Sequence, residues 1–217
     1  MATKISNDRR NEILDVSELL FIHKGYVSTT INDILAKVGI AKGTFYYYFD
    51  SKESLLDSLI LRRLNVCIDQ MEDVLFDVDM TPQEKLYHAL LVQKYFFQNE
   101  NVLKANIQLK ENAQVRQQSY IQSMINFPPI VTKIIVEGVN KQVFYTRFPR
   151  FSAEVLLSNT LIFDSELFRW SKTEKEDRAK GYIHLAESCL GLGEGDLSIL
   201  LGLFQDKNVC EIKRVLK

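Results

Sequence analysis

Residues 30–52 constrain the fold of this chain more than any other stretch, because they have the pattern of two short helices joined by a tight turn. Thr30 is followed three positions later by Asp33, the spacing of a capping box at a helix start. Apolar residues then recur at helical spacing until Gly39, which can adopt the positive φ that ends a helix. The pattern predicts a short first helix with one buried face.

The segment after Gly39 predicts a second short helix rich in aromatic and hydroxyl side chains. Phe45 and Phe49 stand four positions apart, so we expect them to anchor this helix inward. The tyrosines at 46–48 cannot all face the core, because neighbouring residues on a helix point about 100° apart. At least one phenol must point outward, where it can hydrogen-bond a phosphate. A helix this short is unstable alone in water, so a three-helix core must hold it.

Two short helices joined by a turn containing glycine are the layout of a helix-turn-helix, whose second helix enters the DNA major groove. These residues closely resemble the DNA-binding domain of the tetracycline-repressor (TetR) family of bacterial regulators. The matching pattern consists of the first helix (10–26), Thr29-Thr30, Asp33-Ile34, Val38-Gly39, residues 42–49 and Ser51-Lys52-Glu53. Beyond roughly the first quarter of the chain, only length and helical character agree. Two residues depart from the family: Leu35 replaces a small Ala, and Ala41 replaces a capping Ser or Thr.

The resemblance implies an all-α protein with a homeodomain-like, three-helix N-terminal domain and a C-terminal helical domain for ligand binding and dimerisation. We predict the DNA-binding domain at 1–52, a linking helix at 53–76 and the effector-binding and dimerisation domain at 77–217.

The side chains that we expect to contact DNA lie in the helix-turn-helix and just after it. The candidates are Thr30, Asn32, Lys42, Gly43, Thr44, Tyr46, Tyr47 and Lys52. Lys52 and Tyr46 are expected at phosphates, with amides of helix N-termini assisting them. The base edges are expected nearest to Lys42, Gly43 and Tyr47.

Charge argues against binding by bulk basicity. The chain has 27 Lys and Arg against 28 Asp and Glu, a formal net charge of −1. Any DNA contact must therefore be a local patch, built from Arg9, Arg10, Lys42 and Lys52 with helix N-termini and hydroxyls. Such a patch favours modest non-specific affinity and dependence on a dimer for strength.

Cysteine and histidine usage indicates neither a disulfide framework nor a metal site. The three cysteines (67, 189, 210) lack C-x-x-C pairing, and the three histidines (23, 88, 184) lie far apart. The N-terminus is polar, and no stretch approaches the roughly 20 apolar residues of a membrane helix. We therefore expect a cytoplasmic protein with no metal, no cofactor and no membrane contact.

Helical periodicity continues through the rest of the chain. Thr81, Pro82 and Glu84 form a strong helix start, with a cap, a proline at the first helical position and an acid three after the cap. We expect Pro128-Pro129 to break a polar helix that begins near residue 112, and residues 144–150 to form a loop. The other predicted helices span about 7–25, 52–76, 82–97, 102–109, 130–139, 152–170, 174–190 and a short stretch from 196.

The helices predicted at 152–170 and 174–190 have broad apolar faces, which suggests burial on two sides. Resemblance to the family implies that they pair with their symmetry mates in the four-helix bundle of a homodimer, with Leu157 and Leu185 in the seam. The alternative is that these faces complete the monomer's own core.

Several aromatic side chains of the second domain could line an effector cavity, and few charged residues fall on its apolar faces. The residues that we expect at this pocket are Phe96, Phe97, Phe127 and Phe163. The pattern favours an apolar or aromatic small molecule. The resulting interpretation is a ligand-responsive repressor that binds a palindromic DNA operator as a homodimer. The alternative is a protein of this fold that binds small molecules or partners without reading DNA. Nothing supports an enzyme, because no nucleophile, base and orienting acid are arranged together.

Overall fold

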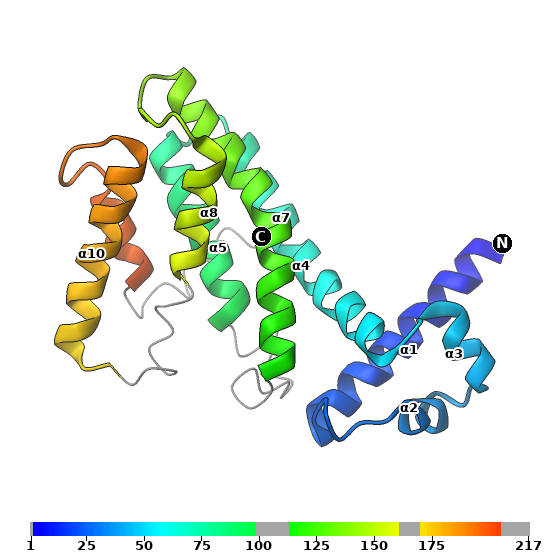
Figure 1. The fold of residues 1–217 in the computed structure, drawn as a ribbon. Helices are drawn as coiled ribbons and strands as arrows, with labels where there is room; N and C mark the ends of the chain where they lie inside the picture. Colours follow the sequence, from blue (N-terminus) through cyan, green and yellow to red (C-terminus); the bar gives the residue numbers. More distant parts are fainter. Residues whose placement is uncertain (1, 99–112, 161–169, 205–217) are drawn as a thin grey trace. The chain divides into compact units, whose positions relative to one another are not determined.

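The structure of the chain is a computed structural model that describes residues 2–98, 113–160 and 170–204 (Figure 1). Within these ranges every regular element is a helix, in agreement with the predicted all-α class. The elements are α1 (Ala2–Lys24), α2 (Ile31–Val38), α3 (Lys42–Tyr48), α4 (Lys52–Phe76), α5 (Pro82–Gln98), α7 (Ala113–Asn140), α8 (Pro149–Thr160), α10 (Lys172–Leu190) and the 3-10 helix η2 (Ser198–Phe204). None of these described helices is sufficiently long and apolar to span a bilayer.

The chain divides into two compact units. Of the described residues, the first unit contains α1, α2, α3, α4 as far as Asn65, and α7 as far as Gln122. The second unit contains the remainder of α4 and α7 together with α5, α8, α10 and η2. Two helices, α4 and α7, therefore contribute to both units. The domain limits at residues 52 and 76 stay predictions.

The first unit is held together by an apolar core and by ion pairs between α1 and α4. Phe21 packs edge-to-face on Tyr26, with ring centroids 5.1 Å apart. Arg62 donates to Asp15 at 2.6 Å and also pairs with Glu18, which in turn accepts from Arg63. The fully buried core residues include Ile13, Leu14, Phe21, Tyr26, Ile34, Phe45, Leu55, Leu56 and Leu59. These contacts make α1 and the first turns of α4 one rigid support.

The second unit packs α8 between α5 and α10 through apolar side chains and two side-chain-to-backbone hydrogen bonds. Gln93 Nε2 donates to the Leu157 carbonyl at 3.0 Å, and Tyr182 Oη donates to the Leu156 carbonyl at 3.1 Å. Both leucine side chains are fully buried. Because these bonds satisfy polar groups in an apolar interior, they fix the register of α8 against its two neighbours.

Helix α7 runs without a break through Pro128 and Pro129, so the prediction that this pair ends a helix is wrong. A proline inside a helix removes a hydrogen bond and crowds the preceding turn. Here Phe127, Ile130 and Val131 are buried beside the pair. Apolar burial on both sides of the prolines therefore keeps the helix continuous despite the lost backbone bonds.

Several helix ends differ from the prediction, while the caps agree with it. α1 begins at Ala2, and α8 begins at Pro149, inside the expected loop. The capping box of Thr81 and Glu84 is present, with Thr81 N donating to Glu84 Oε2 at 2.8 Å. The short helix expected from residue 196 is the 3-10 helix η2. The helix expected at 102–109 lies outside the described residues.

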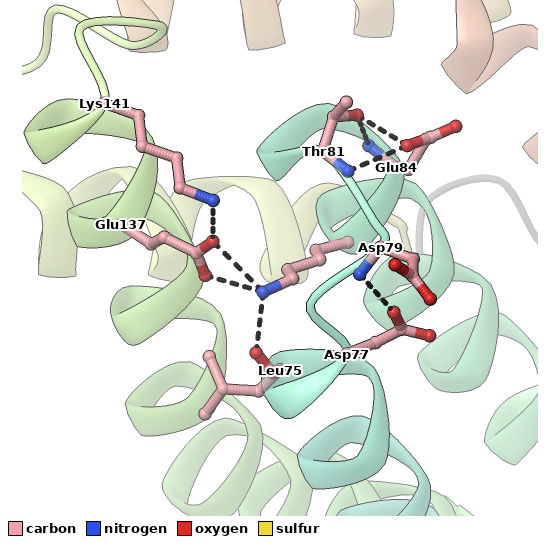
Figure 2. A network of polar contacts seen from close by, with 8 residues as sticks. Leu75, Asp77, Asp79, Thr81, Glu84, Glu137 and Lys141 are labelled. Atoms are coloured by element: carbon pink, nitrogen blue, oxygen red, sulfur yellow. Dashed lines mark hydrogen bonds and ion pairs between the residues drawn. The ribbon is translucent and has the colours of Figure 1, made fainter.

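A buried lysine joins three elements of the second unit. Lys85, on α5, is only 4% exposed, and its Nζ donates to the Leu75 carbonyl at the end of α4 at 2.8 Å. The same ammonium pairs with Glu137 of α7 at 2.9 Å, and Lys141 donates to the other Glu137 oxygen at 2.7 Å. Figure 2 shows Glu137 and Lys141 beside the segment from Leu75 to Glu84. The Lys85–Glu137 pair therefore ties the C-terminal part of α7 to the junction of α4 and α5.

Replacing Glu137 by Gln is expected to destabilise the chain by about 2 kcal/mol at neutral pH, because the buried Lys85 ammonium loses its charged partner. Urea unfolding followed by circular dichroism measures this difference. Glu154→Gln is the control: it breaks an exposed pair with Arg150 and should cost less than about 0.5 kcal/mol.

The effect of Glu137→Gln on the free energy of unfolding should depend on pH. Burial raises the pKa of Glu137, but hydrogen bonds from Lys141 and Lys85 outweigh burial and leave the pKa below its usual value. The carboxylate therefore contributes stability above the pKa of an unfolded Glu, about 4.3, and that contribution is lost as the pH falls through the lower folded value. The stability difference between wild type and Glu137→Gln should shrink at acidic pH. A difference that stays constant would contradict this account.

Candidate nucleic-acid interface

Helix α2 begins and ends as its sequence predicts. The capping box is complete: Asp33 N donates to Thr30 Oγ1 at 3.2 Å, and Thr30 N donates to Asp33 Oδ2 at 2.7 Å. Gly39, with φ of 73°, ends the helix in the left-handed conformation. Lys24 pairs with Asp33 at 2.6 Å, and this pair, together with the bonds from Thr30, lowers the pKa of Asp33. The start of α2 is therefore locked to the end of α1.

Helix α3 is anchored by two aromatic side chains. Phe45 and Phe49 are both buried, as predicted, and their ring centroids lie 5.8 Å apart. The guanidinium of Arg10 lies 5.1 Å from the Phe49 ring and also donates to Ser58 Oγ at 2.9 Å. The N-cap residue Ala41 offers no side-chain cap, so packing alone fixes the orientation of this helix.

The opposite face of α3 is open. Tyr47 is 75% exposed and Tyr46 is 43% exposed, which confirms that the three tyrosines cannot all enter the core. The ammonium of Lys42 lies 5.9 Å from the Tyr46 ring, and the Tyr47 ring packs edge-to-face on Tyr48 at 4.9 Å. A short helix thus exposes two phenols, one cation and a glycine.

The predicted DNA contacts lie close together in the chain, but not all have free polar groups. Asn32, Lys42 and Gly43 are exposed, and Thr44 is half-buried. Thr30 is exposed, yet its hydroxyl also donates to Asp33 Oδ2 at 2.8 Å within the capping box. Lys42 has no carboxylate partner among the residues that the structure describes. The role of all eight residues at DNA stays a prediction.

Lys52 has an internal role that sequence reasoning missed. Its Nζ donates to the carbonyls of Tyr26 and Thr29, both at 2.9 Å, and lies 4.3 Å from the Tyr26 ring. These two bonds use two of the three N–H donors of the ammonium. Lys52 thereby holds the loop between α1 and α2 against the start of α4. No local signal indicates this contact, because its partners lie 23 and 26 residues earlier in the chain.

Tyr26 completes this loop anchor. Its ring is buried, and its hydroxyl donates to Glu53 Oε1 at 3.4 Å. Burial, followed by the nearby Glu53 carboxylate, raises the pKa of Tyr26 to about 12. The phenol therefore stays protonated at physiological pH and keeps its donor role. Lys52 and Tyr26 together position the N-terminus of α2, which carries the candidate contacts Thr30 and Asn32.

Three of the four residues predicted at an effector pocket come together in the second unit. The Phe96 ring packs edge-to-face on Phe97 at 4.9 Å and on Phe127 at 5.7 Å. Phe96 and Phe127 are buried, and Phe97 is half-buried. Phe163 lies outside the described residues. The cluster joins α5 to α7 through contacts between aromatic rings.

Two protein-family models match the chain. Residues 13–59 match the family described as bacterial regulatory proteins, tetR family, and residues 95–183 match the tetracyclin repressor-like C-terminal domain. The first match includes every candidate DNA contact, and the second includes the aromatic cluster.

Individual relatives agree with these matches. The chain is 28% identical over 170 residues to the HTH-type transcriptional regulator YerO of Bacillus subtilis, and 41% identical over 58 residues to the HTH-type transcriptional repressor KstR2 of Rhodococcus jostii. The matched regions span 74% and 27% of this chain, but only 58% and 28% of those relatives. The solved structure of the fatty acid degradation regulator FadR from Bacillus halodurans is 18% identical, with a TM-score of 0.57, covering 89% of this chain and 95% of that one. At this identity the likeness concerns the fold.

Lys52→Ala is expected to destabilise the first unit by about 1–2 kcal/mol, because two backbone carbonyls lose their donor and the Tyr26 ring loses its cation. The matched control is Lys42→Ala, which removes an exposed lysine and should change stability by less than about 0.5 kcal/mol. Thermal unfolding followed by circular dichroism measures both. Equal effects of the two substitutions would argue against the internal role of Lys52.

Proposed function

The chain belongs to the tetR family of bacterial regulatory proteins and is a helix-turn-helix transcriptional regulator; from this premise we propose that it is a ligand-responsive repressor that binds a palindromic operator as a homodimer. The observation that carries the proposal is the outward face of α3, where Lys42 and Tyr47 are displayed by a helix anchored through Phe45 and Phe49. The name of the Rhodococcus jostii relative, a repressor, supports the direction of regulation. A regulator that binds the bacterial operator acts in the cytoplasm, and we propose that location for this chain.

At the operator, α3 enters the major groove and the residues around it hold the backbone. Lys42, Gly43 and Tyr47 lie nearest the base edges, where the long cationic side chain can donate to guanine. Tyr46 and the remaining donor of Lys52 reach phosphates, assisted by Asn32 and the first amides of α2. Thr30 and Thr44 serve as further backbone contacts.

We propose that the dimer forms through the outer face of α8. On this helix Phe151, at 65% exposed, and half-exposed Val155 are four positions apart, and Phe148, at 68% exposed, directly precedes the first helical residue, Pro149. An apolar stripe of this kind on a helix favours a protein partner over water. A second copy covers it by twofold symmetry, and such a dimer matches a palindromic operator whose half-sites lie about 34 Å apart in successive major grooves.

The burial of individual side chains corrects the expected seam. Leu157 is 0% exposed and packs inside the monomer, so it cannot be a seam residue. Most apolar residues of α10, including Tyr182, Ala186 and Leu190, are likewise in the monomer's core, while its outer face is largely charged. For these residues the alternative of a completed monomer core is correct. Half-exposed Leu185 and Cys189 are the apolar residues through which α10 can contribute to the interface.

The proposed effector is an apolar or aromatic small molecule that binds in the second unit beside Phe96, Phe97 and Phe127. The apolar character of this cluster supports the class of ligand. The effector must bind the DNA-free conformer more tightly than the DNA-bound one, with a coupling of about 1–3 kcal/mol.

The test of DNA reading is selection of bound duplexes from a random library by the full chain. We expect an inverted repeat to be enriched, and its binding to weaken steeply with salt. Lys42→Ala should cost about 1–3 kcal/mol on the selected site and change the preferred bases, because it removes a base contact. The control is Lys175→Ala, an exposed lysine of α10, which should leave preference and affinity unchanged. No enrichment with wild type would favour a ligand-binding or interaction protein that does not read DNA.

Phe151→Glu is expected to convert the dimer to a monomer at micromolar concentration. Operator binding should then weaken strongly, because a single helix-turn-helix makes few contacts with DNA. Light scattering measures the mass, and circular dichroism checks folding. Val78→Glu is the matched control, since it places the same charge on a loop side chain that is at least as exposed. A wild-type chain that is monomeric would overturn both the interface and the palindromic operator.

A further inference from the structure

The middle of α7 carries two adjacent prolines with no backbone N–H to donate. In an uninterrupted helix the amides at 128 and 129 would bond to the carbonyls of Met124 and Ile125. Pro128 and Pro129 cannot make these bonds, and their rings crowd the same two carbonyls. Helix α7 therefore has one turn, at residues 124–129, in which two consecutive rungs of its hydrogen-bond ladder are absent.

A third feature weakens the same region. Thr132 Oγ1 donates to the Pro128 carbonyl at 2.6 Å, one turn further on. A threonine that bonds back to the carbonyl four residues earlier competes with the backbone donor and favours a bend. Kinks in helices have specific causes, and here proline and a back-bonded threonine coincide.

The weak turn begins where α7 passes from one compact unit to the other. The first unit includes α7 as far as Gln122, and the second unit begins again at Ser123. The other helix shared by the units, α4, changes unit between Asn65 and Val66 and contains neither proline nor glycine. Of these two connections, α4 has an intact ladder and α7 has a defect at the crossing.

The two parts of α7 are anchored to different units. In the first unit, Gln118 donates to Asp57 of α4, and Val115 and Ser119 are buried. In the second unit, Glu137 is held by the buried Lys85, which also binds the end of α4 (Figure 2). Each part is fixed by side chains to its own unit, so a bend of α7 between these anchors is easiest in the turn that lacks two backbone hydrogen bonds.

We propose that Pro128-Pro129 is a hinge, which lets residues 113–123 of α7, on the N-terminal side of the weak turn, change direction relative to residues 130–140 on its C-terminal side. The burial of Phe127, Ile130 and Val131 keeps the helix together while the backbone bends. With this hinge, α7 does not join the two units as stiffly as the uninterrupted helix α4 does. This inference depends on the architecture of the chain and not on the proposed operator or effector, so its failure leaves the proposed function untouched.

Hydrogen exchange of the full chain tests the weak turn directly. Peptides covering 124–133 should exchange about tenfold faster than peptides covering 114–121 or 134–139 of the same helix. Pro128→Ala/Pro129→Ala restores both donors with the best helix former, and should slow the central peptides to the rate of their neighbours. Lys133→Ala, an exposed position on the same helix, is the control and should change nothing. Equal exchange along wild-type α7 would overturn the proposal.

Spin-label distances test the motion itself. Labels at Lys37→Cys in the first unit and Lys175→Cys in the second would be placed in a chain with Cys189 and Cys210 replaced by Ser. Cys67 can stay, because burial raises its pKa to about 12 and the thiol is unreactive. Labelled chains are diluted in unlabelled ones, so that only distances within one chain are measured. The double Pro→Ala variant should narrow the distance distribution about twofold relative to wild type and Lys133→Ala. Equal widths in all three would show that the prolines are not a hinge.

Discussion

A helix of seven residues is too short to persist in water, and the display of the candidate DNA-binding side chains depends on overcoming that limit. Burial of Phe45 and Phe49 provides the stabilisation, and the residues between them are then directed outward by helix geometry. The anchor itself requires a rigid support, which the ion pairs of Arg62 and Arg63 with α1 provide. The exposed surface of α3 is therefore a property of the whole first unit.

Several lysine side chains bind groups of the same chain and stabilise its fold. Lys52 binds the α1–α2 loop, Lys24 binds Asp33, and Lys85 binds Glu137 and the end of α4. The near-zero net charge is thus no argument against DNA binding, because few cations need to face the DNA if they are well placed. It does mean that affinity has to come from geometry, since bulk attraction is absent.

The burial of side chains within the monomer also limits which residues can form a dimer interface. Leucines on α8 such as Leu157 belong to the monomer's core, and the exposed apolar stripe comprises Phe148 and Phe151. A sequence pattern reports that a helix has an apolar face, but the same pattern serves burial against the same chain or against a second copy. The double proline is a similar case: local rules predict a break, whereas burial of Phe127 and Ile130 keeps the helix intact.

The sequence by itself determined the features that depend on residues a few positions apart. These are the capping boxes at Thr30 and Thr81, the left-handed end at Gly39, the two anchors of α3 and the outward tyrosines. All of them follow from backbone hydrogen bonding and helical periodicity, which act over one or two turns. Contacts between residues far apart in the chain were decided only by the tertiary structure, because no local pattern specifies them. Lys52 binds the loop around Tyr26, and Lys85 pairs with Glu137. Leu157 is buried in the core of the monomer. In each case packing brings together residues that are distant in the chain.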